Sequence, residues 1–163
     1  MRTSRKIFAL LAMSALAAIC GFAQAPETSK PVASSYDAAL AKKLGADERG
    51  MKTYVLCILK TGPNDAEMKG KERDDIFAGH FANIGRLADE GKLAVAGPFG
   101  QNDRSYRGLY IFNVGTIAEA EKLVVLDPAV KAGVFIPELT LWYATAALME
   151  TPEIHKKLAK PSK

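Results

Sequence analysis

The chain has 163 residues, of which 48% are apolar and 25% are charged, a composition typical of globular proteins. Its formal net charge is +4, but without Arg2, Arg5 and Lys6 only 19 basic residues face 18 acidic ones. This balance gives no support to a nucleic-acid partner, and the length allows one domain with flanking segments.

Residues 1–23 have the features of a secretory signal peptide. A basic start precedes the apolar run 7–20 and then small residues, so we expect cleavage after Ala23 or, alternatively, after Ala25. The apolar run is shorter than the roughly 18–20 residues that cross a bilayer. The segment predicts a periplasmic or secreted protein with no membrane span after cleavage. An uncleaved amino-terminal anchor is the alternative.

The segment 24–50 is predicted to be a linker that contains one short helix. Residues 24–34 are rich in Pro, Ser, Ala and Thr, whereas 35–44 carry apolar residues at helical spacing before Gly45. The helix either packs on the domain or tethers it. If the leader leaves with Cys20, Cys57 remains as a single cysteine in a strand-like run, which predicts a buried thiol and no internal disulfide.

The domain is predicted at 51–148, beginning with a strand over 52–59 that is apolar on both faces. The charged segment 69–72 is expected to be a loop. Apolar residues that repeat at intervals of three and four predict a long helix over 76–88, ended by Gly91.

The second half of the domain is predicted to hold four more elements of the sheet and helix layers. They are a strand at 92–96, a strand at 106–114, a helix capped by Thr116, and a last strand at 134–144. Residues 149–163 are expected to form a polar tail, in which Thr151 can start a short helix.

The order β-α-β-β-α-β predicts an α+β fold of the ferredoxin-like type, with both helices on one face of an antiparallel sheet. Residues 53–59 and 110–114 are apolar on both faces, so the second face also needs cover. Packing against a second copy would give a homodimer, a dimeric α+β barrel with a cavity at or beside the junction. A monomer covered by the helix at 35–44 is the alternative.

His80 is the first candidate for chemistry. It lies between Ile76 and Ile84 on the apolar stripe of the predicted helix. It is either a structural histidine bonded to a carbonyl and a water, or a general acid or base whose ordinary pKa is about 6.5.

Asp127 precedes Pro128, a pattern typical of a helix N-cap. A carboxylate can also accept a hydrogen bond from an imidazole and hold the ring in one tautomer. A capping aspartate has lone pairs to spare, so both roles can hold. His80 and Asp127 are therefore the candidate catalytic pair.

Four further residues are candidates for substrate binding. Gly97, Pro98 and Phe99 are either a turn with a core phenylalanine or the wall of a ligand site. Arg107 is either a solvated charge or a receptor for an anion. Trp142 and Tyr143 are predicted to be core or dimer contacts.

Several kinds of site are excluded by spacing. His80, His155 and Cys57 lack metal-ligand spacing. The chain also lacks a glycine-rich phosphate loop and a Gly-x-Ser-x-Gly elbow. We therefore expect no metal and no cofactor.

These residues make the chain resemble the YCII-related (YciI-like) family over about 51–148. The likeness rests on the strand 52–59, on His80 followed by Gly91 and by Ala96-Gly97-Pro98-Phe99, on the segment 107–112, and on Asp127-Pro128 with Gly133. The resemblance implies the ferredoxin-like fold, the dimeric barrel, and a histidine–aspartate site at His80 and Asp127. Most members have no established activity. One related branch is a dehydrochlorinase of chlorinated hydroxyquinols, which brings acid–base elimination on a small ring within the fold's reach.

The chain departs from the family pattern at two places. Many members have Arg-Pro just before the histidine, where this chain has Phe77-Ala78-Gly79, and many have an aromatic residue where it has Ala129. Substrate contacts through those positions are not carried over. The family is also mostly cytoplasmic, whereas this chain begins with a predicted leader.

Two functions follow from these observations. The first is a cofactor-independent lyase or isomerase, in which His80 moves a proton on a small enolisable or phenolic molecule and Asp127 fixes its tautomer. The alternative is a non-catalytic module that binds a small ligand and uses His80 only as a hydrogen-bond donor. A filled cavity would instead favour a structural role.

Overall fold

The fold is described by a computed structural model covering residues 36–160. The predicted leader, the first part of the predicted linker and residues 161–163 lie outside the described residues. Among the helices of residues 36–160, none combines the length and the apolar character that a membrane crossing requires.

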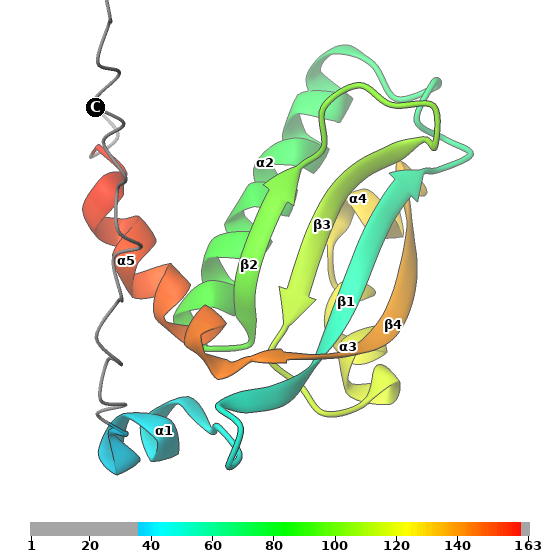
Figure 1. Cartoon of the computed structure of the whole chain (residues 1–163). Helices are drawn as coiled ribbons and strands as arrows, with labels where there is room; N and C mark the ends of the chain where they lie inside the picture. The colour runs from blue at the N-terminus through cyan, green and yellow to red at the C-terminus, as the bar shows by residue number, and fades with distance from the viewer. Residues whose placement is uncertain (1–35, 161–163) are drawn as a thin grey trace, which may run out of the picture. The chain divides into compact units, whose positions relative to one another are not determined.

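Four antiparallel strands form one sheet in the order β2-β3-β1-β4 (Figure 1). They are β1 (Met51–Thr61), β2 (Leu93–Pro98), β3 (Tyr106–Phe112) and β4 (Phe135–Thr145). The central strand β1 pairs with β3 on one side and with β4 along its whole length on the other. The predicted β-α-β-β-α-β order is present, with a short extra helix before the last strand.

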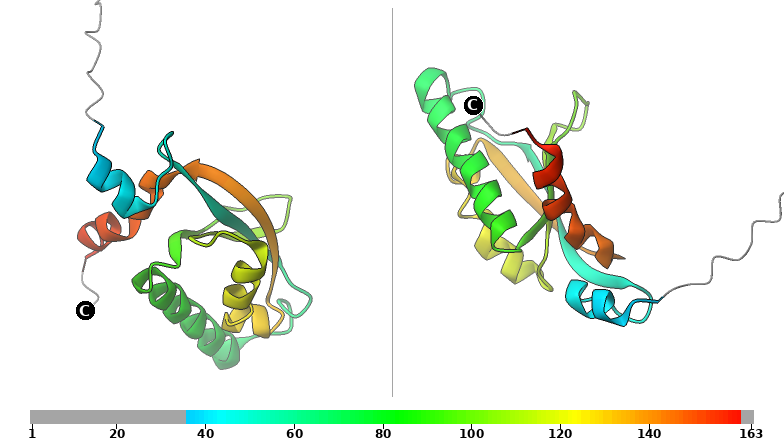
Figure 2. Two further views of the ribbon diagram at one scale, coloured as in Figure 1. Left: turned by 90° about the horizontal axis from the view of Figure 1, so that it is seen from below. Right: turned by 90° about the vertical axis from the view of Figure 1, so that its left-hand side faces the viewer.

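Three helices lie on one face of the sheet, behind it in Figure 1 and to one side of it in the left view of Figure 2. They are α2 (Gly70–Asp89), α3 (Ile117–Val124) and α4 (Pro128–Lys131). Alternate residues of β1 and β3 point to this layer and form the main core with Leu87 of α2 and Val124 of α3. The strand residues are Val55, Cys57, Leu59, Tyr110 and Phe112.

Two predicted boundaries are corrected by local contacts. The charged segment 69–72 is not a loop throughout, because α2 begins at Gly70 and Lys71 pairs with Asp75 one turn later at 2.7 Å. Strand β3 ends at Phe112 rather than at 114, because Asn113 turns away from β1. Its backbone N–H donates to the Lys92 carbonyl and its side chain donates to the Gly91 carbonyl.

The turn after β1 is tied to the turn before β4. The Gly62 N–H donates to the Val134 carbonyl at 2.8 Å, and the Asn64 side chain donates to the Ala132 carbonyl at 2.8 Å. A Cβ on Gly62 would lie 2.2 Å from the Gly133 carbonyl oxygen, so only glycine allows the two backbones to approach this closely.

The second face of the sheet is covered in part by the segment after β4. The 3-10 helix η1 (Ala146–Glu150) packs Leu148 and Met149 against a small cluster that includes Tyr54 and Ile111. Met149, expected in the polar tail, therefore belongs to the packed part of the chain. It is followed by α5 (Thr151–Leu158), which begins at the residue predicted to start a helix.

Helix α1 (Ala38–Leu44) is followed by the glycine cap Gly45, as predicted, but it does not cover the second face as the monomeric alternative requires. None of its residues is buried, and its main packing partner is η1. Trp142 and Tyr143 are not core residues of this chain, because they lie on the edge strand with 38% and 48% of their surface exposed.

Candidate functional site

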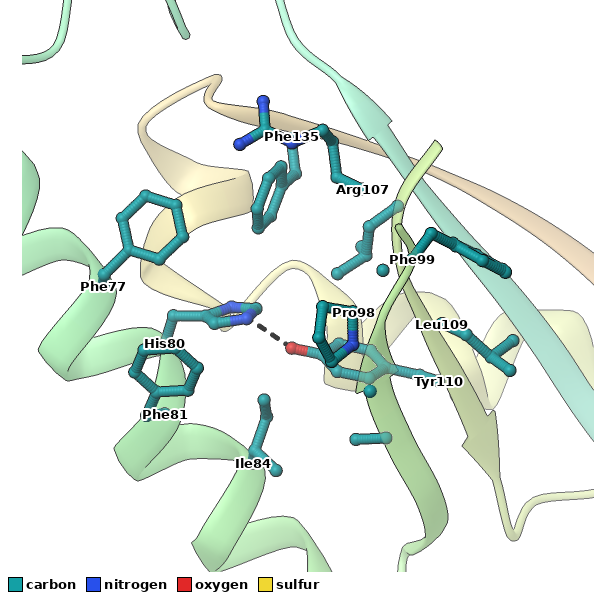
Figure 3. Close-up of a pocket in the computed structure, with 14 residues that line it drawn as sticks. Phe77, His80, Phe81, Ile84, Pro98, Phe99, Arg107, Leu109, Tyr110 and Phe135 are labelled. Atoms are coloured by element: carbon teal, nitrogen blue, oxygen red, sulfur yellow. Dashed lines mark hydrogen bonds between the residues drawn. The ribbon is translucent and has the colours of Figure 1, made fainter. Parts of the chain in front are cut away.

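A cavity of about 440 Å³ lies between α2 and the strands β2 and β3. Figure 3 shows its lining, which is mainly aromatic and aliphatic. Five of the six predicted site residues line it: His80, Gly97, Pro98, Phe99 and Arg107. The sixth, Asp127, lies behind His80 and does not reach the cavity surface. Side chains therefore do not fill the space beside His80.

His80 and Asp127 are hydrogen-bonded inside the protein. His80 Nδ1 lies 2.9 Å and 3.0 Å from the two carboxylate oxygens of Asp127. The exposed fraction is 6% for His80 and 0% for Asp127. A carboxylate accepts but does not donate, so Nδ1 carries the hydrogen and Nε2 carries the lone pair of the neutral ring.

The free ring nitrogen retains exposed surface at the cavity. Among residues 36–160, no group is hydrogen-bonded to His80 Nε2, whose ring partners all meet Nδ1. In the same residues, the only fully buried side-chain nitrogen or oxygen without a partner is Asn83 Nδ2. Nε2 is therefore not sealed off, and it is available to a molecule in the cavity that His80 lines.

A glycine and a helix cap bring the pair together. A Cβ on Gly79 would lie 2.9 Å from Pro128 Cγ, so glycine at this position lets α2 approach α4 closely. Asp127 is the N-cap of α4 and accepts from the Ala129 N–H at 2.8 Å. The cap holds one carboxylate oxygen and leaves further lone pairs for His80. The geometry thus accommodates both roles considered for Asp127.

Tyr110 is a residue of the candidate site that sequence reasoning missed. Its hydroxyl donates to Asp127 Oδ2 at 2.7 Å and lies 3.2 Å from His80 Nδ1. Its ring stacks with that of His80 at a centroid distance of 6.0 Å. The usable signal was a tyrosine on the core face of a strand, since a buried hydroxyl needs a partner. That partner is not adjacent in sequence.

Burial and hydrogen bonding set the charge states around Asp127. Burial acts to raise the pKa of Asp127, but hydrogen bonds from His80 and Tyr110 hold it below its usual value. Burial and the nearby Asp127 charge raise the pKa of Tyr110. At neutral pH the carboxyl is therefore ionised and the phenol protonated. An ionised Asp127 stabilises an imidazolium at His80, which suits a general base.

Cys57 lies close enough to Asp127 for the carboxylate charge to shift its pKa, but it is not a candidate nucleophile. Its thiol is buried, and burial together with the Asp127 charge raises its pKa to about 12. A thiol in that state is not nucleophilic at neutral pH. This agrees with the prediction of a buried structural cysteine.

Arg107 is held by an ion-pair network rather than free in solvent. Its Nη1 lies 2.8 Å from Asp65 Oδ2, and Arg73 Nη2 lies 2.9 Å from Asp65 Oδ1. Burial opposes ionisation of Asp65, but hydrogen bonds from both arginines hold its pKa below the usual value. The interpretation of Arg107 as a solvated strand end is therefore wrong. Asp65 and Arg73 were missed because they are distant from Arg107 in sequence.

Part of the cavity wall is formed by Phe99, the first residue of the hairpin that joins β2 to β3. Phe99 packs against Tyr106 at a centroid distance of 5.7 Å. Asn102 holds the turn from within: it accepts from the backbone N–H groups of Arg104 and Tyr106 and donates to the carbonyls of Gly100 and Tyr106. Phe99 is therefore a wall of the cavity rather than a core residue.

The donor set around the cavity is poor in metal ligands. In the part of the chain that the structure describes, no group of three or more His, Cys, Asp or Glu side chains could hold a metal ion. The polar side chains that line the cavity are an imidazole, a phenol and a guanidinium. These groups can exchange protons and bind an anion.

Comparison with known proteins gives a family for the chain. No curated protein matches it significantly. Among solved structures it is similar to 5-chloro-2-hydroxyhydroquinone dehydrochlorinase from Burkholderia phenoliruptrix AC1100, in complex with 2,5-dihydroxybenzoquinone. The identity is 25%, over 55% of this chain and 90% of that chain, with a TM-score of 0.38. The model of the YCII-related domain matches residues 53–142, more than half of the chain. The chain therefore belongs to the YCII-related domain family.

Proposed function

We propose that the protein is a cofactor-independent lyase or isomerase that moves a proton on a small enolisable or phenolic substrate. One observation carries the proposal: a 2.9 Å bond from His80 Nδ1 to buried Asp127, which leaves Nε2 available at an apolar cavity of about 440 Å³. The arrangement meets the geometric requirements of a general base with an orienting carboxylate.

The chemistry follows from the tautomer. His80 Nε2 takes a proton from a carbon next to a carbonyl or from a phenolic oxygen, and the resulting imidazolium pairs with Asp127. In an isomerase the same nitrogen returns the proton to another carbon of the substrate. In a lyase the electron pair left on the substrate expels an adjacent leaving group. Tyr110 acts as a positioning residue, because its hydroxyl bonds Asp127.

The proposal includes a homodimer in which two copies pack their second sheet faces together as an α+β barrel. Leu56, Ile58 and Leu109 are only half buried on that face, and this partial exposure supports a second copy as cover. Sedimentation should find a dimer that Ile58→Glu converts to a monomer. A monomeric wild-type protein would contradict this part. With residues 1–23 as a leader, the dimer works in the periplasm or outside the cell.

A non-catalytic ligand-binding module is the second candidate. The apolar lining of the cavity favours it, because a small molecule can be held there by burial of its surface and one hydrogen bond, without any reaction. In this function His80 holds a ligand by one hydrogen bond and the ligand leaves unchanged.

Proton exchange distinguishes the two functions. Small enolisable ketones and dihydroxyphenols are incubated with the protein in D₂O, and NMR follows deuterium entering their activated C–H positions. We expect exchange that falls about 100-fold or more in His80→Gln, the usual contribution of general base catalysis. His155→Gln is the matched control, because His155 is exposed on α5, and it should exchange normally.

The outcome against the enzyme is equally plain. Equal rates of proton exchange in His80→Gln and in wild type would contradict the proposed chemistry, provided that circular dichroism shows both proteins folded. Binding of these compounds with no exchange in any variant assigns the non-catalytic function instead.

A further inference from the structure

The end of the cavity away from His80 carries an unbalanced positive charge. Arg73 and Arg107 share the single carboxylate of Asp65, so this cluster keeps one net positive charge. Among the described residues that line the cavity, none is a carboxylate. Asp127 is the nearest buried acid to His80, and it is shielded from the cavity by the imidazole.

The two arginines differ in what they can offer a ligand. Arg73 Nη1 donates to the Asp65 carbonyl at 2.9 Å and its Nη2 donates to the Asp65 side chain, so both ends of its fork hold the turn. Arg107 lines the cavity and uses only Nη1, on Asp65. Among residues 36–160 no acceptor is bonded to its Nη2 or Nε. A guanidinium has five donors, so most of those on Arg107 remain for a ligand.

Phe135 sets the separation between the two polar ends. Its ring centroid is 5.4 Å from that of His80 and 5.6 Å from Arg107 Cζ. In Figure 3, Arg107 and Phe135 lie at one end of the cavity, with His80 and Phe81 further along it. A molecule that touches both His80 and Arg107 therefore spans about one aromatic ring with its substituents. The phenyl faces around the cavity favour a flat ligand.

We propose that the ligand of this cavity is a small ring that carries one carboxylate, bound by Arg107, with its acidic hydrogen directed at His80. The role of His80 rests on the function proposed above, whereas the carboxylate anchor rests on the Arg107 end alone. A monoanion matches the single net charge there, and a dianionic phosphate would leave charge unpaired in an apolar cavity. A carboxylate also matches the fork of a guanidinium.

Benzoate and its neutral isostere benzamide are the probes. Isothermal titration calorimetry on the purified protein at low salt should give benzoate at least tenfold tighter binding than benzamide. The preference should shrink as salt is added. Arg107→Gln should remove it, and Arg107→Lys should keep part of it. Arg104→Gln is the matched control, because it removes an exposed positive charge from the neighbouring hairpin.

The wild-type comparison needs no variant, so the proposal is testable even if Arg107→Gln unfolds. Equal affinity for benzoate and benzamide in wild type overturns the inference, and so does a full preference in folded Arg107→Gln. A benzoate preference with no proton exchange supports the carboxylate anchor and contradicts the proposed enzyme. Proton exchange without a benzoate preference supports the enzyme and contradicts the anchor.

Discussion

Each end of the cavity is held by one carboxylate, and the two carboxylates work in different surroundings. Asp127 is fully buried and receives bonds from His80, the Tyr110 hydroxyl and the Ala129 N–H. The Asp65 side chain is 18% exposed and is shared by two arginines. The comparison teaches that burial matters more than the number of charged partners. A buried carboxylate contributes strongly to the stability of the fold, whereas a partly exposed one mainly orients the side chain that it pairs with.

The largest effect is expected at the buried end. Asp127→Ala leaves three donors without an acceptor and removes the cap of α4, so we expect a loss of about 3–5 kcal/mol in the free energy of unfolding. Urea denaturation measures it. Asp127→Asn keeps an acceptor and should lose less. A loss below about 1 kcal/mol in the alanine variant would contradict the central place given to Asp127.

The pH dependence of stability should differ between the two ends. The folded pKa of Asp127 is below its unfolded value of about 3.9. Its contribution to the free energy of unfolding is therefore complete above that pH and disappears as the pH falls through the folded pKa. The deficit of Asp127→Asn against wild type should therefore be larger at pH 6 than at pH 3. Asp65→Asn should show a smaller change in the same direction. A deficit of Asp127→Asn that is independent of pH would be the contrary result.

Two glycines of α2 allow a matched test of the helix contact behind the site. Gly85→Ala meets nothing within 4 Å and should stabilise the helix by up to about 1 kcal/mol. Gly79→Ala meets Pro128 and should fall about 1–3 kcal/mol below that control in thermal unfolding. Equal stability of the two variants would show that α2 and α4 do not depend on this close approach.

The smallest effect on stability is expected at the exposed end. Asp65→Asn breaks two ion pairs that water partly screens, so we expect a loss of less than about 1 kcal/mol. Urea denaturation of Asp65→Asn and Asp127→Ala, measured side by side, ranks the two losses in the free energy of unfolding. If Asp65→Asn cost as much as Asp127→Ala, burial would not be the deciding difference between the two ends.

The local parts of this arrangement could be predicted from the sequence. The order of strands and helices follows from hydrophobic spacing, and the caps at Thr116 and Asp127 follow from residue type next to a helix start. The meeting of His80 with Asp127 was proposed from residue type and from the family resemblance. The signals for the elements and the caps lie within a few residues of the feature that they predict, whereas the His80–Asp127 pair joins residues 47 positions apart.

The remaining parts depend on contacts between distant segments. Tyr110 has a hydroxyl whose partner is fixed only when β3 faces α4, and Asp65 meets Arg107 only when the sheet is paired. Trp142 was expected to be a core or a dimer contact because it is apolar, and the edge position of β4 rules out the core of this chain by leaving it partly exposed, whereas the dimer contact stays a prediction. Composition alone does not distinguish an edge strand from a central one.

The hairpin between β2 and β3 has a consequence for how the protein can be altered. The turn after β1 is bonded to the turn before β4, so neither can change length without the other. The hairpin turn is organised mainly by its own Asn102, with a further bond from the Thr61 N–H to the Ser105 carbonyl, and it directly follows Phe99, which lines the cavity. We expect residues 100–105 to behave as an exchangeable cassette. New turns grafted there would change which molecules enter, while the base and the anion anchor stay in place.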